Sequence, residues 1–221
     1  MSPRQPGRRP LSHQRIIEAA LAVADRGGVG AVSMRRVAEV LGVEAMALYH
    51  HLPNKNALLD GLIDAVFAEI DAPNAEDDWQ TALHKRCAST RRALFRHSWV
   101  LGLIESRDHV GPNRLHHHNA VLGIVLGAGL SPVDAVLAVS VLDSYVYGFV
   151  LQEKQHQVSA PTDTQEAASQ MVDQLPVGDL PHLRAVAEAV SAGFAPSYDD
   201  TFAYGLRIIL DGLHPATDAS A

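Results

Sequence analysis

Residues 41–59 read LGVEAMALYHHLPNKNALL and gather side chains that can bind a phosphate without burying a full charge. Tyr49, His50 and His51 follow one another, and Lys55 comes four residues later. Compact hydrogen-bond donors beside a lysine and the free N–H groups of a helix start suit the phosphates of nucleic acid. Two adjacent histidines also occur as a solvated surface pair, and Tyr49 can be half-buried in a core while it contacts a ligand.

The spacing of small and apolar residues before this stretch predicts a steep corner between two helices. With Met34 as the first position, Ala38 falls at the fifth, Gly42 at the ninth and Leu48 at the fifteenth. The small residue lets the two backbones approach, and glycine accepts the left-handed turn. The pattern is that of a helix-turn-helix, whose second helix enters the major groove of DNA. On spacing alone, any tight corner between two helices remains an alternative.

The run His116-His117-His118 invites a metal hypothesis that its geometry does not favour. Consecutive residues of a helix point about 100° apart, and no carboxylate or cysteine stands at a suitable position one turn away. A solvated helix face, or one histidine turned into a pocket, is the better interpretation. We predict no metal site and no cofactor. An enzyme would need a convergent set of acid, base or nucleophile, and no such set is found.

The elements that must position these residues are helices throughout. No strand alternation persists in the sequence, and hydrophobic periodicity with capping residues predicts an all-α protein. Ser12, Ser33 and Asn54 are the expected N-caps of three N-terminal helices, and residues 159–180 read as a loop. The predicted helices span residues 13–26, 34–41, 44–50, 54–70, 77–97, 99–105, 112–129, 132–157, 181–192 and 198–213.

The distribution of charge divides the chain. The first 60 residues hold eight Arg and Lys against five Asp and Glu, whereas the other 161 hold ten against twenty, so only the first part suits a polyanion. We predict a disordered basic N-terminus (1–11), a helix-turn-helix DNA-binding domain (12–66), a helical-bundle domain for ligand binding and dimerisation (67–214) and a disordered tail (215–221).

Composition indicates a soluble protein of the cytoplasm. Hydrophobic residues make up 47% of the 221, which is too apolar for disorder, and the lone Cys87 cannot form an internal disulfide. No secretory signal is found at the N-terminus, and no apolar run reaches the roughly 18 residues that span a bilayer. We therefore expect no membrane partner.

Residues 33–38 (SMRRVA) followed by 41–62 (LGVEAMALYHHLPNKNALLDGL) resemble the N-terminal domain of the TetR family of transcriptional regulators. Residues 78–80, 129–131 and 148–151 resemble landmarks in the C-terminal half of its tetracycline-repressor class. The resemblance implies a ligand-responsive regulator, most simply a repressor that leaves a palindromic operator when a small molecule binds. A helical-bundle enzyme and a protein-interaction scaffold carrying a helix-turn-helix remain the alternatives.

Carried over by position, the resemblance assigns roles on DNA. Tyr49, His51 and Lys55 would hold phosphates, whereas Arg35 and His50 would face bases or their flanks. Three apolar residues offer no hydrogen bond, so they would contact thymine methyl groups. Arg36 begins the same helix as Arg35 and can reach the backbone or a guanine edge. The apolar residues at this surface are Ala45, Met46 and Ala47.

The resemblance also implies a small-molecule pocket in the C-terminal half. Positions where the tetracycline repressor offers its ligand and metal contacts read here as Arg86, Thr90, Ile104, Val121, Ser144 and Gln152, which argues against a metal-chelated tetracycline. Plain core packing is the alternative for each apolar candidate. The polar candidates are Arg86, Thr90, His97 and Asp143, and the apolar ones are Trp99, Leu103, Ile104, Leu122, Val125, Val141, Tyr145 and Phe149.

Dimerisation would double the contacts on a palindromic site. The family joins helices equivalent to 132–157 and 198–213 into a four-helix bundle across the two-fold axis. Four of the candidate residues recur at i, i+4, i+7 and i+8, so they define one stripe, which can face either a second subunit or the chain's own core. The candidate residues are Leu137, Val141, Tyr147, Phe202, Leu206, Ile209 and Leu210.

Overall fold

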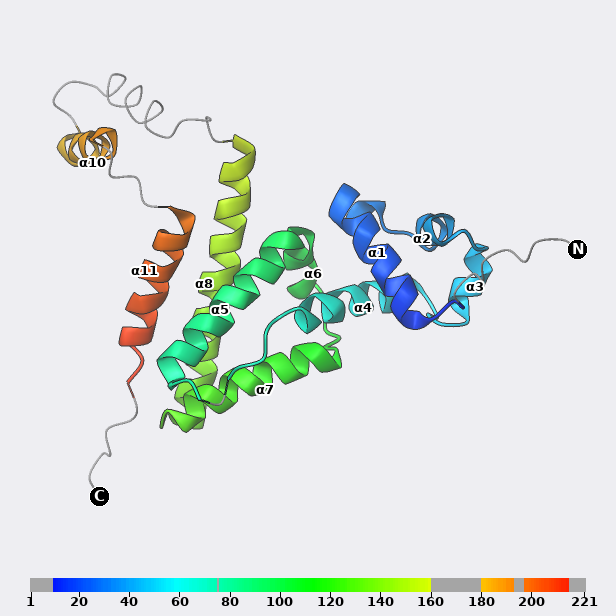
Figure 1. Ribbon diagram of the computed structural model, residues 1–221, viewed down its shortest axis with the longest axis horizontal. Helices are drawn as coiled ribbons and strands as arrows, with labels where there is room; N and C mark the ends of the chain where they lie inside the picture. The colour runs from blue at the N-terminus through cyan, green and yellow to red at the C-terminus, as the bar shows by residue number, and fades with distance from the viewer. Residues whose placement is uncertain (1–9, 75, 160–179, 193–196, 215–221) are drawn as a thin grey trace, which may run out of the picture.

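The computed structural model describes residues 10–74, 76–159, 180–192 and 197–214 (Figure 1). Every regular element in these ranges is a helix, so the predicted all-α class is confirmed. The predicted disordered tail and most of the predicted basic N-terminus and of the loop at 159–180 lie outside the described residues.

Four helices and one 3-10 turn form the N-terminal part: α1 (His13–Gly27), η1 (Val29–Ala31), α2 (Met34–Leu41), α3 (Ala45–Tyr49) and α4 (Lys55–Ala68). The three predicted caps are present, because Ser12, Ser33 and Asn54 each accept a hydrogen bond from the N–H three residues on. Gly42 has φ 64° and ψ 40°, the left-handed conformation that the predicted corner requires. Local sequence signals therefore set this part of the fold.

The C-terminal part contains α5 (Trp79–Arg96), η2 (Ser98–Val100), α6 (Leu101–Ile104), α7 (Pro112–Gly127), α8 (Pro132–Ser159), α10 (Pro181–Ser191) and α11 (Tyr198–Asp211). Helices α5, α7 and α8 pack on one another, and α11 lies against α5 and α8 (Figure 1). The helix predicted at 99–105 is divided into η2 and α6. His97 leaves the helical region before it, with φ −114° and ψ 44°.

Two hydrophobic cores meet within α4. The N-terminal core draws on α1 to α4 and includes Leu58 and Leu62, whereas the C-terminal core begins with Ile63 and Val66. Because consecutive turns of one helix serve both cores, α4 joins the two parts of the molecule (Figure 1). The cores divide close to the domain boundary predicted at residue 66, which stays a prediction.

Helix α8 has two apolar faces. Leu142, Val146 and Val150 are buried in the C-terminal core, whereas Leu137 and Val141 are at least half exposed. The segment Pro132–His156 is also long and apolar enough to cross a membrane by length and composition. This is weak evidence of a membrane span, because the core helix of a soluble protein passes the same test.

The apolar stripe of α11 faces the chain's own core. Phe202, Leu206 and Leu210 are buried in the chain's own C-terminal core, so these three belong to the subunit itself. The opposite side of α11 exposes Tyr204 and Ile208.

Candidate nucleic-acid interface and effector cavity

The short helix α3 is held by the N-terminal core rather than by its own length. It has five residues, too few for an isolated helix, and Leu48 anchors it with a fully buried side chain. Leu52 just beyond it is also buried, and the N–H of Val43 donates to the carbonyl of Ala38 across the corner. The surrounding helices thus give α3 a fixed orientation.

The side chains around α3 face solvent. Met46 is 71% exposed and Tyr49 is 44% exposed, and His50 and His51 are exposed beside them. One apolar and three polar side chains therefore project into solvent from this corner. We define the reading surface as Met46, Tyr49, His50 and His51 of this corner together with Arg35, Arg36 and Lys55.

The start of α4 adds a phosphate-binding character to the reading surface. Asn54 caps the helix through its Oδ1, which accepts from the N–H of Ala57 at 2.9 Å. Lys55 is exposed at the first position, where the backbone N–H groups have no intrahelical acceptor. A cation at a helix N-terminus, near the exposed rings of α3 in sequence, is suited to bind an anionic oxygen.

Both arginines of α2 are tied to one carboxylate. Arg35 Nε donates to Glu39 Oε1 at 3.2 Å, and Arg36 Nη1 donates to Glu39 Oε2 at 3.1 Å. Hydrogen bonds from Arg36 and then Arg35 lower the pKa of Glu39. The side chains of Arg35 and Arg36 are 88% and 59% exposed. Both ion pairs are therefore solvated and weak, so each arginine can exchange Glu39 for a phosphate.

The C-terminal part contains a cavity of about 850 Å³ between α6, α7 and α8, which we call the effector cavity. Its size suits a drug-sized organic molecule. One wall is a helical stripe of α8, and Arg114 at the start of α7 faces it. The lining residues are Leu101, Gly102, Glu105, Arg114, Val136, Val139, Ser140, Asp143, Ser144, Tyr147 and Leu151.

The polar side chains of the effector cavity influence one another. Burial raises the pKa of Asp143 to about 6, and the charge of Arg114 opposes this rise. Burial also raises the pKa of Tyr147, so its phenol stays protonated and can donate. Arg114 Nε and Nη1 and the Tyr147 hydroxyl are buried, and none of the three has a hydrogen-bond partner.

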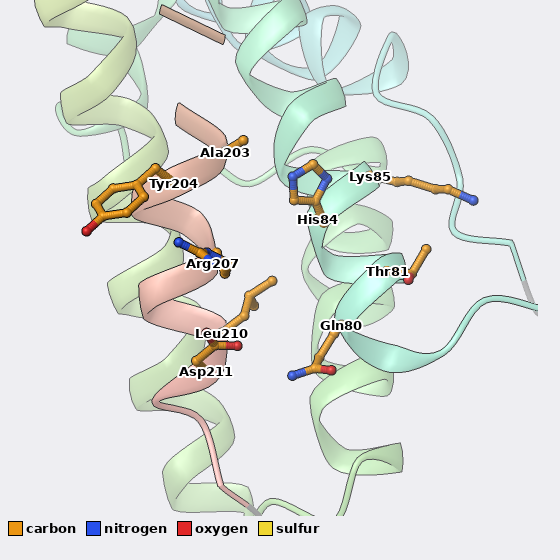
Figure 2. Close-up of a pocket in the computed structure, with 9 residues that line it drawn as sticks. All are labelled: Gln80, Thr81, His84, Lys85, Ala203, Tyr204, Arg207, Leu210 and Asp211. Atoms are coloured by element: carbon orange, nitrogen blue, oxygen red, sulfur yellow. The ribbon is translucent and has the colours of Figure 1, made fainter. Parts of the chain in front are cut away.

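A second hollow lies between α5 and α11 and measures about 620 Å³. Figure 2 shows that α5 and α11 supply its two walls and that Lys85 points away from α11. Both basic groups here that carry a full charge have partners: Lys85 Nζ pairs with Asp77 at 2.7 Å, and Arg207 stacks on the Tyr204 ring. The residues around it are Gln80, Thr81, His84, Lys85, Ala203, Tyr204, Arg207, Leu210 and Asp211.

Helix α4 is bound to the wall of the effector cavity by two carboxylates. Asp64 Oδ1 accepts from the backbone N–H groups of Asn113 at 2.8 Å and Arg114 at 3.2 Å, so it caps α7 from another helix. Asp60 accepts from Arg107 Nε at 2.5 Å. Gly111 permits this approach, because a Cβ at that position would collide with Asp64.

A second joint links α1 and the end of α4 to the end of α5. The buried His97 ring lies 2.7 Å from Asp25 Oδ1 through Nδ1 and 3.1 Å from Glu69 Oε1 through Nε2. Trp99 Nε1 also donates to Asp25 at 2.7 Å, and Arg96 pairs with Glu69. The N-terminal part is thus fixed to the C-terminal part at the middle of α4 and again at its end.

One histidine of the triple run turns inward. His117 is buried, and its Nδ1 lies 2.7 Å from Arg86 Nη2. Burial lowers the pKa of His117 to about 3, so its neutral ring accepts from the arginine. His116 is exposed and His118 is half-buried. Within the part of the chain that the structure describes, no group of three metal-ligating side chains could hold an ion.

Two models of known protein families match the N-terminal and the C-terminal part of the chain. Residues 16–62 match the family model described as bacterial regulatory proteins of the tetR family, and residues 72–216 match the tetracyclin repressor-like C-terminal domain. The chain belongs to the TetR family. It is a DNA-binding regulator with a helix-turn-helix and a ligand-binding C-terminal domain, which confirms the prediction.

Related TetR proteins include repressors from several bacteria. The transcriptional repressor DrrR1 of Streptomyces coeruleorubidus is 33% identical over 95% of this chain and 81% of its own length. The class A tetracycline repressor of transposon 1721 from Escherichia coli is 34% identical over 92% and 90%. The structure of ActR from Streptomyces coelicolor in complex with actinorhodin covers 92% of this chain and 96% of its own, with 26% identity and a TM-score of 0.76.

The twelve side chains predicted for the pocket of this TetR protein are dispersed in the structure. Asp143 lines the effector cavity, whereas His97 and Trp99 lie at the joint with α1 and Val141 is exposed on the outer side of α8. Arg86 donates to the carbonyl of Asp71 and to His117, and Thr90 donates to the carbonyl of Arg86. Leu103, Ile104, Leu122, Val125, Tyr145 and Phe149 pack in or against the C-terminal core.

Arg114 and Tyr147 of the effector cavity were not among the predicted pocket residues. Tyr147 was placed at the dimer seam, and Arg114 received no role. A signal for α8 was present, because Val136, Ser140, Asp143 and Tyr147 follow one another at successive helical turns and share a face. Arg114 gave no such signal, since its contact with this face depends on how α7 crosses α8.

Proposed function

We propose that the protein is a homodimeric repressor that binds a palindromic operator through its reading surface and leaves it when a small molecule occupies the effector cavity. The observation that carries the proposal is the outward projection of Met46, Tyr49 and the two histidines from a corner fixed by Leu48. Relatives that are regulators rather than enzymes support a regulatory rather than a catalytic role.

The reading surface divides between positioning and recognition. Tyr49, His51 and Lys55 hold phosphates, and His50 reaches the bases or their flanks. Met46 lies with Ala45 and Ala47 against thymine methyl groups, because none of the three can donate or accept through its side chain. Arg35 and Arg36 exchange Glu39 for the DNA backbone or a guanine edge.

The exposed apolar residues of α8 and α11 are the proposed dimer face. Val133, Leu137 and Val141 of α8 are at least half exposed, as are Tyr204 and Ile208 of the neighbouring α11. A two-fold four-helix bundle would cover both sets. It would also hold two reading surfaces in the fixed relation that half-sites one turn of DNA apart require, about 34 Å. A cytoplasmic location and the lack of a membrane partner follow from this role.

A small molecule would release the operator by favouring a different position of α4. The solved complex of ActR with actinorhodin supports an organic effector in a protein of this fold. Because α4 belongs to both cores and is capped onto α7, a change at the effector cavity reaches the reading surface without crossing a flexible linker.

Fluorescence anisotropy against genomic fragments tests the proposal. We expect a dimer on a palindromic fragment, with affinity that falls steeply as salt rises. Lys55→Ala should weaken binding to all sequences and reduce the salt slope by about 1, whereas Met46→Ala should change the preference among them. Lys85→Ala, which removes a lysine from α5, is the matched control and should change neither. The absence of any specific fragment at moderate salt would refute the proposal.

A further inference from the structure

The side chains of His97, Asp25, Glu69, Arg96 and Trp99 form a cluster that we call the His97 joint. His97 is buried and follows α5 at the point where the chain leaves the helical region. Its Nδ1 lies 2.7 Å from Asp25 Oδ1 in the last turn of α1, and its Nε2 lies 3.1 Å from Glu69 Oε1 just after α4. One ring thus connects the ends of three helices that belong to both parts of the molecule.

The two contacts of this ring require a proton on each of its nitrogens. An ionised carboxylate only accepts hydrogen bonds, whereas a neutral imidazole has one donor and one acceptor nitrogen. A neutral His97 would therefore place a bare nitrogen against a carboxylate oxygen at hydrogen-bond distance. Only the imidazolium form donates to Asp25 and to Glu69 at the same time.

The charges of the His97 joint balance when the ring is protonated. Arg96 pairs with Glu69, so the cluster holds two carboxylates and two cations. Deprotonation of His97 leaves one negative charge in excess. Within the described part of the chain, no further charged side chain pairs with His97, Asp25 or Glu69.

Two other cations stand near the cluster in sequence. Arg92, one turn before Arg96 in α5, pairs with the exposed Asp71 instead. Arg26 follows Asp25 at the end of α1, where it is exposed, so solvent screens its charge. The buried ring therefore contributes the one cation that contacts both carboxylates.

Loss of the proton should break the contact with Glu69 rather than the one with Asp25. The Nε2 distance is the longer of the two, and Glu69 keeps Arg96 as its partner. The N–H that remains on Nδ1 would still donate to Asp25. The end of α4 would then be held to the end of α5 only by an ion pair whose arginine is exposed, and such pairs are weak.

We infer that His97 is a proton-dependent joint between the DNA-binding part and the C-terminal part. The imidazolium fixes the end of α4 to the end of α5, and its deprotonation loosens this attachment and weakens binding to the operator. The attachment is complete on the acid side and is lost as pH rises through the range in which the ring gives up its proton. Only the effect on the operator rests on the proposed function.

Trp99 supplies an intrinsic reporter of the ring. It lies edge-on to His97 at 6.1 Å between ring centres, and its Nε1 donates to the same Asp25 oxygen at 2.7 Å. A protonated imidazole beside an indole quenches the indole fluorescence more strongly than a neutral one. The chain has two tryptophans, so Trp79→Phe leaves Trp99 as the only source of this signal.

The full-length protein with Trp79→Phe is titrated from about pH 5.5 to about pH 9.5, a range that spans the ordinary titration of histidine. Trp99 emission should rise in one step. His97→Gln should abolish the step, whereas His84→Gln, which removes an exposed histidine of α5, should keep it (Figure 2). Nitrogen NMR of the imidazole rings should show both nitrogens of His97 protonated before the step and only Nδ1 after it.

Fluorescence anisotropy with the operator fragment then measures the effect on DNA. Across the same step, the parent should lose at least about fivefold more affinity than His97→Gln. This comparison removes the contribution of His50 and His51, because both proteins contain them. Circular dichroism shows whether each variant is folded.

Glu69→Gln sharpens the test and keeps it decisive if His97→Gln does not fold. Its amide can accept from the charged ring and, after a flip, donate to the neutral one. Glu69→Gln should therefore keep the Trp99 step and lose the extra pH dependence of operator binding.

Four results would overturn the inference. They are an absent step in Trp99 emission, an unchanged step in His97→Gln, a ring that carries a single proton over the whole range, or the same pH dependence of operator affinity in the parent, His97→Gln and Glu69→Gln. If no genomic fragment binds specifically, the proposed function fails, whereas the Trp99 and NMR titrations still decide whether the proton controls the joint.

Discussion

The two parts of the molecule bury different kinds of side chain. The N-terminal core, from Ile16 to Leu62, is wholly apolar among the described residues. Among the residues of the C-terminal part that the structure describes, six polar or charged side chains are buried: Arg86, Ser89, Thr90, His97, His117 and Glu153. An apolar core holds the reading surface rigid by close packing alone, whereas each buried polar group of the C-terminal part also requires a hydrogen-bond partner in a fixed position.

The two parts also differ in the range of their polar contacts. The N-terminal caps join residues three apart, as Ser33 joins the N–H of Arg36. Arg91, in contrast, pairs with Glu153, 62 residues away, and with Asp199, 108 residues away. The stability of the C-terminal part therefore depends on contacts that form only when its helices have assembled.

The largest effect on stability is expected where a buried charge of the C-terminal part loses its main partner. Arg91 donates to both oxygens of Glu153 at 2.8 and 2.6 Å, and the two side chains are only 12% and 8% exposed. Glu153→Ala should lower the free energy of unfolding by about 4 kcal/mol, because it leaves the buried Arg91 cation with only the exposed Asp199 as a partner. Urea denaturation followed by circular dichroism measures it.

The matched control is the other partner of Arg91. Asp199 is 88% exposed, so Asp199→Ala should change stability by well under about 1 kcal/mol. Similar losses from the two variants would mean that burial does not distinguish these pairs.

The next effect belongs to the apolar N-terminal core. Leu48 is fully buried, and Leu48→Ala should cost about 3 kcal/mol through lost burial and a cavity. Because Leu48 anchors α3, DNA affinity should fall in anisotropy while the C-terminal part stays resistant to limited proteolysis. The exposed Met46→Ala is the stability control. Cleavage within the C-terminal part of Leu48→Ala under the same conditions would show that the two cores are not separable.

A pH-dependent effect is expected at Asp143. Its pKa rises to about 6 on folding from 3.8, so the folded chain binds the proton more tightly, and this stabilisation is lost as pH rises through 6. Above pH 6, the free energy of unfolding of Asp143→Asn should be higher than that of the unchanged protein by about 2 kcal/mol, a figure that allows for partial solvation of Asp143. The difference should vanish near pH 4. Denaturation across this range would contradict the assignment if the gap were constant.

The smallest effect is expected at the reading surface. Glu39 is exposed and holds Arg35 and Arg36 by hydrogen bonds, so its removal should not alter stability measurably. Glu39→Gln should raise affinity for DNA by about threefold at low salt, because both arginines are then free for phosphate. Weaker DNA binding in anisotropy would show that Glu39 orients the arginines rather than withholding them.

The sequence was most informative where structure is local. Ser12, Ser33 and Asn54 marked helix starts that the structure confirms, and Gly42 marked the corner, because caps and turns depend on neighbouring residues. The effector cavity was less predictable. Arg114 comes from α7 and Asp143 from α8, and no periodicity in either helix reveals how the two cross.

Asp64 makes the two parts of this regulator hard to exchange. It lies on the helix that begins at Lys55, yet it supplies the cap that α7 lacks, since Gly111 has no side chain to do so. An engineer who replaced residues 10–66 with a foreign DNA-binding domain would remove Asp64 and leave the start of α7 without its cap. A working chimera would have to cross over before Asp64, so that this carboxylate stays with Gly111 and α7.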